Sequence, residues 1–326
     1  MSMKSQMPWR TRLFTAAYDR LLAEHVDRMS PDQIARGRAR SLPSVPPVTW
    51  ITGRVPRAVQ VTTTTCPTRD GDDVPVRVLR PAGVGADAPA VVFLHGGGWT
   101  VSNPRNYDSL TTWMADSIGA VVIAPDYRKA PQHRAPTAAY DCFDVLAWAA
   151  EHPQAVGGHN GRIALAGDSA GGNLSAVVSL LARDAGGPPV AGQALIYPAT
   201  DLTRSHASSH WAHEAVLSGP RLEAFLAFYL DGSGIEPDNP LVSPQFASSH
   251  ADLPPTLIQV AGCDPLRDEA EHYGELLRAA GNDVQVSRYA GMPHGFMSFP
   301  GAAPAARRAR SELRQSLAAW LAVAPT

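Results

Sequence analysis

Short apolar runs alternate with segments of helical periodicity along most of the chain. The runs predict β-strands over residues 90–94, 120–124, 163–166, 191–197, 256–260 and 284–289. Between most of them, apolar positions recur every three or four residues and predict helices over 107–117, 136–151, 173–183, 268–280 and 304–323. Strands that are apolar on both faces need a cover on each side, so the alternation indicates an α/β fold with a mostly parallel sheet. Ligands of such sheets bind beyond the carboxyl ends of the strands.

Two parts of the chain interrupt this alternation. Residues 59–63 and 74–78 alternate apolar and polar positions on either side of a turn, which predicts a β-hairpin. A helical stretch over 202–239 stands where a short crossover is expected. This stretch is long enough to be an insertion that lies over the ligand-binding end of the sheet.

The N-terminal segment has helical periodicity and is expected to attach to the main domain. Its second helix is predicted to begin at Ser30-Pro31, because serine is a favourable N-cap and proline fits the first turn. Its first helix carries an amphipathic stripe formed by Leu13, Ala17, Leu21 and Leu22.

A serine flanked by glycines lies at one predicted strand-to-helix corner. Ser169 stands between strand 163–166 and helix 173–183, with Gly167 and Gly171 at the spacing G-x-S-x-G. This spacing is typical of a nucleophile elbow, a turn so tight that a Cβ at either glycine would clash. The alternative is an ordinary glycine-rich loop. An elbow would lift the hydroxyl above the sheet, beside the N-terminus of the next helix.

A serine hydroxyl becomes a good nucleophile only when a base takes its proton, and the base needs a third group to orient it. Asp264 and His294 each follow a later predicted strand. Ser169, Asp264 and His294 occur in the chain order of α/β-hydrolases. Asp268 is a competing acid, but we expect it to cap the following helix.

The intermediate of acyl transfer needs hydrogen-bond donors for its oxyanion. The sequence His-Gly-Gly-Gly-Trp over 95–99 directly follows strand 90–94. Its glycines allow backbone N–H groups to approach a substrate, although a flexible loop is the alternative. We expect the N–H groups of Gly97, Gly98 and Ala170 to form an oxyanion hole.

Together these motifs resemble those of the bacterial hormone-sensitive-lipase-like carboxylesterases, also called family IV esterases. The resemblance extends from about 89 to 299 and rests on the segments 95–99, 126–128, 167–174, 264–269 and 294–296. It implies an α/β-hydrolase fold with an eight-stranded, mostly parallel sheet, helices on both faces and a helical cap. The implied cap comprises 1–45 and 202–240, and the implied catalytic domain comprises 46–201 and 241–326. The family usually has Leu and Glu where this chain has Lys129 and Gln132.

The same resemblance implies nucleophile Ser169, acid Asp264 and base His294, without a cofactor. The expected function is a serine carboxylesterase that hydrolyses short- to medium-chain acyl esters through an acyl-enzyme intermediate. Lactone or amide hydrolysis, or acyl transfer to an alcohol, would use the same three residues. A protein of this fold that only binds a ligand is a further class. It has no positive support, because all three catalytic positions are filled.

The sequence also contains candidates for the walls of the substrate pocket and for a dimer contact. Pocket walls are expected from five apolar side chains, for each of which core packing is an equal alternative: Trp99, Tyr127, Trp211, Leu217 and Phe225. Strand 284–289 is expected at the edge of the sheet, where it could pair with a second copy in a homodimer.

A group of histidines raises the question of a metal. His206, His210 and His213, followed by Glu214, are spaced to share one helical face. No H-E-x-x-H pattern accompanies them, so we expect no metal site.

The amino-acid composition limits which classes of partner and which cellular compartment we expect. The net charge is −2, from 28 basic and 30 acidic residues without a basic block, which argues against nucleic acid or an anionic membrane as partner. Three cysteines without a C-x-x-C pair argue against a disulfide framework and favour the cytoplasm. No apolar run approaches the roughly 18 residues of a membrane span, so we expect none. A small-molecule ester is the expected substrate.

Overall fold

A single mixed sheet forms the centre of the protein. The computed structural model describes residues 6–21, 26–41, 43, 45–56, 58–210 and 216–322. Its eight strands follow the order β1-β2-β4-β3-β5-β6-β7-β8. β2 pairs antiparallel with β1 and β4, and the other pairs are parallel. The predicted eight-stranded, mostly parallel sheet is therefore confirmed, with β8 at its edge.

The predicted strands are present with small shifts at their ends. Their bounds are β1 Val59–Pro67, β2 Asp73–Pro81, β3 Ala90–Leu94, β4 Val121–Pro125, β5 Ile163–Asp168, β6 Val190–Ile196, β7 Thr256–Cys263 and β8 Val284–Pro293. Side chains alternate between the two faces, because successive residues of a strand point in opposite directions. In β3, Val91 and Phe93 belong to one core, and Val92 and Leu94 belong to another. This alternation explains why the whole strand is apolar.

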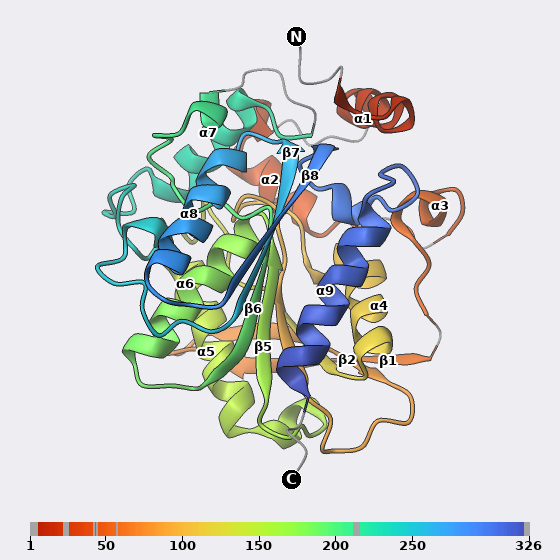
Figure 1. Ribbon diagram of the computed structural model, residues 1–326, viewed down its shortest axis with the longest axis vertical. Coiled ribbons are helices and arrows are strands. Elements are labelled where there is room, and N and C mark those ends of the chain that lie inside the picture. Colours follow the sequence, from red (N-terminus) through yellow and green to blue (C-terminus); the bar gives the residue numbers. More distant parts are fainter. Residues whose placement is uncertain are drawn as a thin grey trace.

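Helices cover both faces of the sheet (Figure 1). Their bounds are α4 Asp108–Ile118, α5 Thr137–Glu151, α6 Ala170–Asp184, α8 Arg267–Ala279 and α9 Ala306–Leu321. α4 and α9 pack on one face, whereas α5, α6 and α8 pack on the other. All five predicted helices are confirmed. No helix in the described ranges is both long and apolar enough to cross a bilayer.

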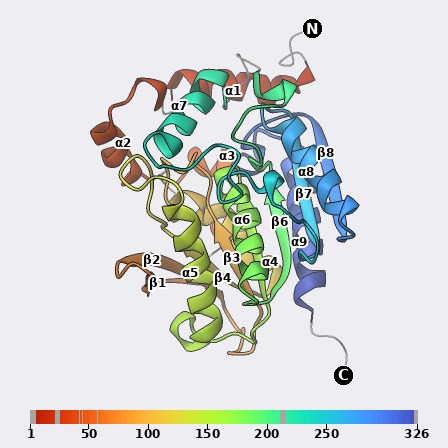
Figure 2. The same ribbon diagram turned by 90° about the vertical axis from the view of Figure 1, so that its left-hand side faces the viewer.

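Three N-terminal helices and one inserted helix lie outside this core. Their bounds are α1 Trp9–Leu21, α2 Pro31–Arg38, α3 Val48–Thr52 and α7 Gly219–Leu230. In Figure 2, α1, α2 and α7 gather at one end of the molecule. α2 begins as predicted: the Ser30 hydroxyl accepts the Gln33 N–H, and the Gln33 side chain accepts the Ser30 N–H.

α1 packs on the loop that precedes α9. The Thr11 hydroxyl donates to the Ala302 carbonyl at 2.9 Å. The rings of Phe14 and Tyr18 lie 4.7 and 5.6 Å from that of Phe299. Aromatic side chains bury a large apolar area, so this face of the helix turns inward.

The predicted apolar stripe of α1 consequently points outward. Leu13 is 64% exposed, and Ala17 is also exposed. The Leu21 side chain and Leu22 lie outside the described residues. An apolar stripe normally faces the core of a protein, so the outward orientation of this one is unusual.

Candidate active site

Ser169, His294 and Asp264 form a continuous hydrogen-bonded chain. His294 Nε2 lies 2.8 Å from Ser169 Oγ, and His294 Nδ1 lies 2.7 Å from Asp264 Oδ2. The histidine and the aspartate are buried, whereas the serine is half-buried. When Asp264 accepts a hydrogen bond from the Nδ1–H group, Nε2 carries no proton and can accept the serine proton. The structure thus brings together the three residues that the sequence singled out.

The corner that carries Ser169 has the geometry expected of an elbow. Ser169 has a φ of 56°, in the left-handed region that costs free energy for a residue with a side chain. A Cβ on Gly171 would lie 1.9 Å from the Leu94 carbonyl oxygen, and one on Gly167 would lie 2.2 Å from that of Gly171. Close backbone contact therefore requires glycine at both flanking positions.

The competing acid has a different set of contacts. Asp268 lies in the first turn of α8, whose N-cap position is occupied by Leu266, so the expected capping role is wrong. Its carboxylate accepts the Ser208 N–H at 3.0 Å and pairs with Arg267. Asp264, in contrast, accepts the Leu266 N–H at 3.0 Å with Oδ1, which leaves Oδ2 for the histidine.

The glycine loop after β3 offers unpaired backbone donors. Gly97 and Gly98 have φ values of 122° and 57°, which residues with side chains rarely adopt. Ala170 is the first residue of α6, so its N–H has no acceptor within the helix. Among the described residues, none accepts a hydrogen bond from these three N–H groups. Such donors suit an oxyanion.

Asp168 joins this loop to the elbow, a role that sequence reasoning missed. Its Oδ1 accepts the Gly96 N–H at 2.8 Å, and its Oδ2 accepts the Tyr107 hydroxyl at 3.2 Å. Burial raises the pKa of the carboxyl to about 6, while the Gly96 N–H and nearby His294 lower it. The position beside the serine is visible in the sequence, but the partners of Asp168 come from the loop after β3 and the turn before α4.

Two of the expected wall residues support the glycine loop from within the core. The Trp99 indole N–H donates to Asn173 Oδ1 at 3.2 Å, and its ring stacks on that of Tyr229 at 4.6 Å. The buried Tyr127 hydroxyl donates to the His95 carbonyl at 2.8 Å. These contacts give both residues a packing role.

The other expected wall residues differ in position. Leu217 is buried, and the half-buried Phe225 lies over the glycine loop. A Cβ on Gly98 would lie 2.3 Å from the Phe225 ring. Trp211 lies outside the described residues.

Two further side chains near the site were missed by sequence reasoning. The buried Asn173 amide donates to the carbonyls of Ala199 at 2.9 Å and Val242 at 2.8 Å. The Tyr197 ring lies 4.9 Å from the His294 ring. Both belong to apolar or helical stretches, so nothing in the local pattern distinguishes them.

Lys129 and Gln132 form contacts close to the glycine loop. The buried Lys129 ammonium donates to the Tyr127 carbonyl at 2.8 Å and to the Asp126 carboxylate. Desolvation lowers the pKa of Lys129. Gln132 accepts a hydrogen bond of 2.8 Å from Arg38 of α2. Neither side chain contacts the chain of Ser169, His294 and Asp264.

The histidine group has ordinary polar contacts where it is described. His206 Nε2 lies 3.3 Å from Gln245 Oε1 and 3.7 Å from the Asp201 carboxylate. His213 and Glu214 lie outside the described residues. Within the ranges that are described, no three His, Cys, Asp or Glu side chains are arranged to hold a metal ion.

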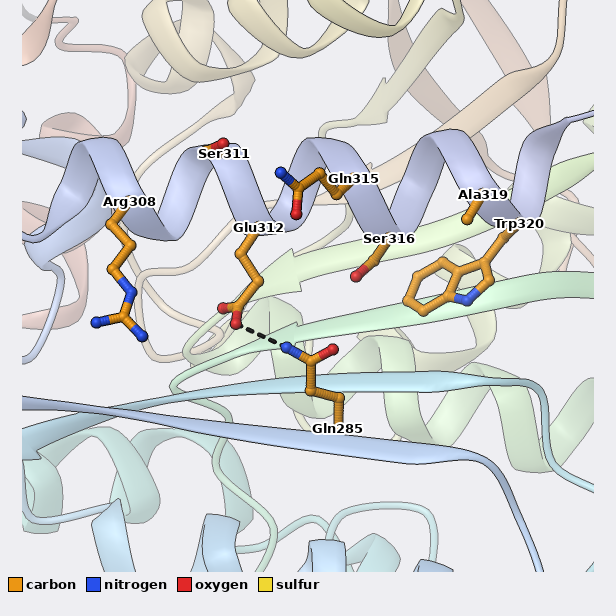
Figure 3. Close-up of a pocket in the computed structure, with 8 residues that line it drawn as sticks. All are labelled: Gln285, Arg308, Ser311, Glu312, Gln315, Ser316, Ala319 and Trp320. Atoms are coloured by element: carbon orange, nitrogen blue, oxygen red, sulfur yellow. Dashed lines mark hydrogen bonds between the residues drawn. The ribbon is translucent and has the colours of Figure 1, made fainter.

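A groove of about 490 Å³ lies elsewhere, between α9 and β8 (Figure 3). Its lining is largely polar, and Gln285 donates to Glu312 across it at 2.7 Å. None of Ser169, His294 and Asp264 lines this groove. It therefore has no part in the arrangement described above.

Comparison with known proteins identifies the family to which the chain is similar. A family model of the alpha/beta hydrolase fold matches residues 91–298. The carboxylesterase NlhH of Mycobacterium tuberculosis is 41% identical over 254 residues, which cover 75% of this chain and 79% of that protein. The ethyl acetate hydrolase of Pseudomonas putida is 36% identical over 239 residues, which cover 71% of this chain and 73% of that protein.

Solved structures show the same likeness over nearly the whole chain. A hyperthermophilic esterase from the archaeon Pyrobaculum calidifontis has a TM-score of 0.84 at 33% identity, covering 96% of this chain and 98% of the other. A bacterial heroin esterase has a TM-score of 0.85 at 26% identity, covering 99% of this chain and 100% of the other. The similarity thus includes the N-terminal segment as well as the sheet.

Proposed function

The chain belongs to the α/β-hydrolase family, in its hormone-sensitive-lipase-like group, and hydrolyses carboxylic esters; we propose that it uses Ser169 as the nucleophile. In this proposal the substrates are short- to medium-chain acyl esters, and the reaction passes through an acyl-enzyme intermediate. The observation that carries the proposal is the hydrogen-bonded chain of Ser169, His294 and Asp264, with distances of 2.8 and 2.7 Å.

The mechanism follows from the proton positions in that chain. His294 Nε2 takes the proton of Ser169 as Oγ attacks the ester carbonyl, and the same nitrogen then protonates the departing alcohol. Water repeats the sequence on the acyl-enzyme, and Oγ leaves with the returned proton. Asp264 keeps the proton on Nδ1 and stabilises the imidazolium that forms. The oxyanion of each tetrahedral intermediate accepts hydrogen bonds from the N–H groups of Gly97, Gly98 and Ala170.

We also propose that residues 1–45 and 202–240 form a cap over this site. Arg221 of α7 pairs with Asp19 of α1 at 3.0 Å. Phe225 and Phe228 of α7 belong to a small apolar cluster with Ile34 of α2. These contacts join the two segments to each other, which supports a single two-part cap.

Replacement of the proposed nucleophile tests the mechanism. Ser169→Ala should retain its circular dichroism spectrum but lose at least about 10⁴-fold in kcat on p-nitrophenyl butyrate. Ser179→Ala is the matched control, because it removes a buried hydroxyl from α6, the helix that follows Ser169, and this hydroxyl has no hydrogen-bond partner among the described residues. Undiminished turnover by Ser169→Ala would disprove the assignment.

Panels of substrates distinguish ester hydrolysis from the other reactions that Ser169, His294 and Asp264 could support. A series of p-nitrophenyl esters from acetyl to palmitoyl measures the acyl-length preference, which we expect to fall steeply for the longest chains. Lactone and anilide substrates, and an added alcohol acceptor, test the alternatives. A faster rate on a lactone or anilide than on every ester would replace the proposed substrate class. Ligand binding without turnover of any substrate would favour the non-catalytic alternative.

The compartment and the oligomeric state are proposed on separate grounds. We propose a cytoplasmic location because Cys66 and Cys142 are buried free thiols. We propose a homodimer through residues 284–289 because β8 lies at the edge of the sheet. Fractionation of expressing cells tests the former, and a monomer in light scattering would exclude the latter.

A further inference from the structure

The outer face of α1 presents large apolar side chains to solvent. Trp9 is 61% exposed and Leu13 is 64% exposed, although they lie one helical turn apart on the same side. Ala16 and Ala17, one turn further on, are also exposed. Single exposed apolar residues are common, but a stripe with this spacing has a defined direction.

α3 carries a second group of exposed apolar side chains. Trp50 of α3 is 69% exposed, and Val45 just before it is 57% exposed. Both helices pack on one loop: Thr11 of α1 bonds to Ala302, and the Gly301 N–H donates to the Ile51 carbonyl at 3.0 Å. Figure 1 shows α1 and α3 on the same side of the molecule. We call the outer faces of α1 and α3, with Trp9, Leu13 and Trp50, the N-terminal face.

The N-terminal segment is basic, although the whole chain is slightly acidic. Residues 1–57 contain ten lysines and arginines against four acidic residues, a net charge of +6. Residues 58–326 contain 18 basic and 26 acidic residues, a net charge of −8. Three of the arginines, Arg10, Arg12 and Arg20, are exposed on α1 itself. The total of −2 therefore conceals a strong separation of charge.

We propose that the N-terminal face docks on the surface of an anionic phospholipid bilayer. Tryptophan and leucine on one side of a helix, with arginines beside them, are the features of a helix that lies in the membrane interface. Tryptophan favours the headgroup level, and each arginine near an anionic surface adds about a fivefold preference. The helix would lie on the membrane without crossing it.

The charge also argues against a second copy as the occupant. Two molecules that met symmetrically through this face would bring their own arginines together. Like charges in contact disfavour such a dimer. An acidic lipid surface, in contrast, complements the arginines and accepts the apolar side chains at the same time.

Docking would place the proposed active site beside the membrane. The loop on which both helices pack, 299–302, lies between His294 and α9, which begins at Ala306. This consequence rests on the proposed function, whereas the docking itself does not. Binding to lipid can therefore be measured independently of hydrolysis.

Vesicle flotation with the full chain tests the docking. We expect the protein to float with vesicles of phosphatidylglycerol and phosphatidylcholine, to bind pure phosphatidylcholine weakly, and to be released by high salt. Arg10→Gln with Arg12→Gln should weaken partitioning about 30-fold or more. Trp9→Ser with Leu13→Ser should weaken it about tenfold or more.

Matched variants control for charge and for exposed apolar area. Arg307→Gln with Arg314→Gln removes two exposed charges from α9, and Phe246→Ser removes an exposed ring elsewhere. Both should bind vesicles as the unmodified protein does. All variants should hydrolyse a soluble ester at the unmodified rate, because each of these side chains is exposed on the outer surface and none contacts Ser169, His294 or Asp264.

Three results would overturn the docking proposal. The first is failure of the unmodified protein to float with anionic vesicles. The second is flotation that neither α1 double variant weakens relative to its control. The third is a dimer in solution that Trp9→Ser with Leu13→Ser converts to a monomer, since a second copy would then be the occupant.

Discussion

The Asp168 carboxylate accepts the N–H of Gly96 at 2.8 Å, and this bond ties the glycine loop to the serine corner. Asp168 directly precedes Ser169, so one short bond links the proposed nucleophile to the loop that carries the proposed oxyanion donors. The carboxyl is buried, and its second oxygen accepts the Tyr107 hydroxyl. Asp168 is thus a positioning residue that holds the two parts of the site in register.

We predict that Asp168→Asn lowers kcat about tenfold and leaves KM nearly unchanged. The amide oxygen can still accept from Gly96, but a neutral acceptor holds an N–H about half as strongly as a carboxylate. Loosened oxyanion donors affect the transition state more than the bound ester. Steady-state kinetics on p-nitrophenyl butyrate measure both constants. A raised KM at constant kcat would contradict a positioning role.

The unfolding free energy of Asp168→Asn should depend on pH differently from that of the unmodified protein. The folded pKa of Asp168, about 6, is higher than the roughly 3.9 of an unfolded aspartate. The stabilisation from this group is therefore complete below about pH 4 and is lost as the pH rises through 6. Between pH 4 and 7 the unmodified protein should lose about 3 kcal/mol of unfolding free energy relative to Asp168→Asn.

Urea unfolding of the two proteins across this pH range measures the difference. A constant gap from pH 4 to 7 would contradict the raised pKa. A variant that is slower at neutral pH yet gains stability relative to the unmodified protein would show that the charged carboxylate is kept for catalysis.

Substitution of the two candidate acids, Asp264 and Asp268, should have clearly different effects on catalysis. Asp264→Asn should lower kcat about 10⁴-fold, because an amide orients the wrong tautomer of His294. Asp268→Asn is the control: it should lower the melting temperature through its contact with Ser208 while kcat stays within about threefold. Kinetics and thermal unfolding of both variants check this. A larger loss of kcat in Asp268→Asn would reverse the assignment.

The glycine loop is predicted to tolerate a methyl group poorly at Gly98. In Gly98→Ala the new Cβ would lie 2.3 Å from the Phe225 ring. The alanine would also have to adopt the φ of 57° that Gly98 has. We expect a loss of about 10²-fold in kcat, comparable to the loss of one oxyanion donor. Adding Phe225→Ala removes the collision and should restore about tenfold. A double variant no faster than the single one would show that backbone strain alone limits the rate.

The order of elements and of site residues could be predicted because each depends on near neighbours. Apolar runs of strand length between helical segments require a covered sheet, and all the strands and helices predicted from them are present. The glycine at 167 is required by a contact within its own turn, with the Gly171 carbonyl, whereas the glycine at 171 is required by the Leu94 carbonyl of β3. Ser169, Asp264 and His294 could be grouped because the carboxyl ends of parallel strands share one edge of the sheet.

The remaining features depend on which distant segments come into contact. Asp168 and Gly96 are 72 residues apart, and no local pattern pairs them. The direction of α1 was also undetermined: its leucine stripe predicts one buried face, but contact with Phe299 turns the other face inward. The sequence by itself thus determines the helices, the strands and the tight turns, because these depend on local sterics and periodicity. The tertiary structure decides which distant residues bond to each other and which face of a helix points outward, because only one of several apolar faces can be buried at a given contact.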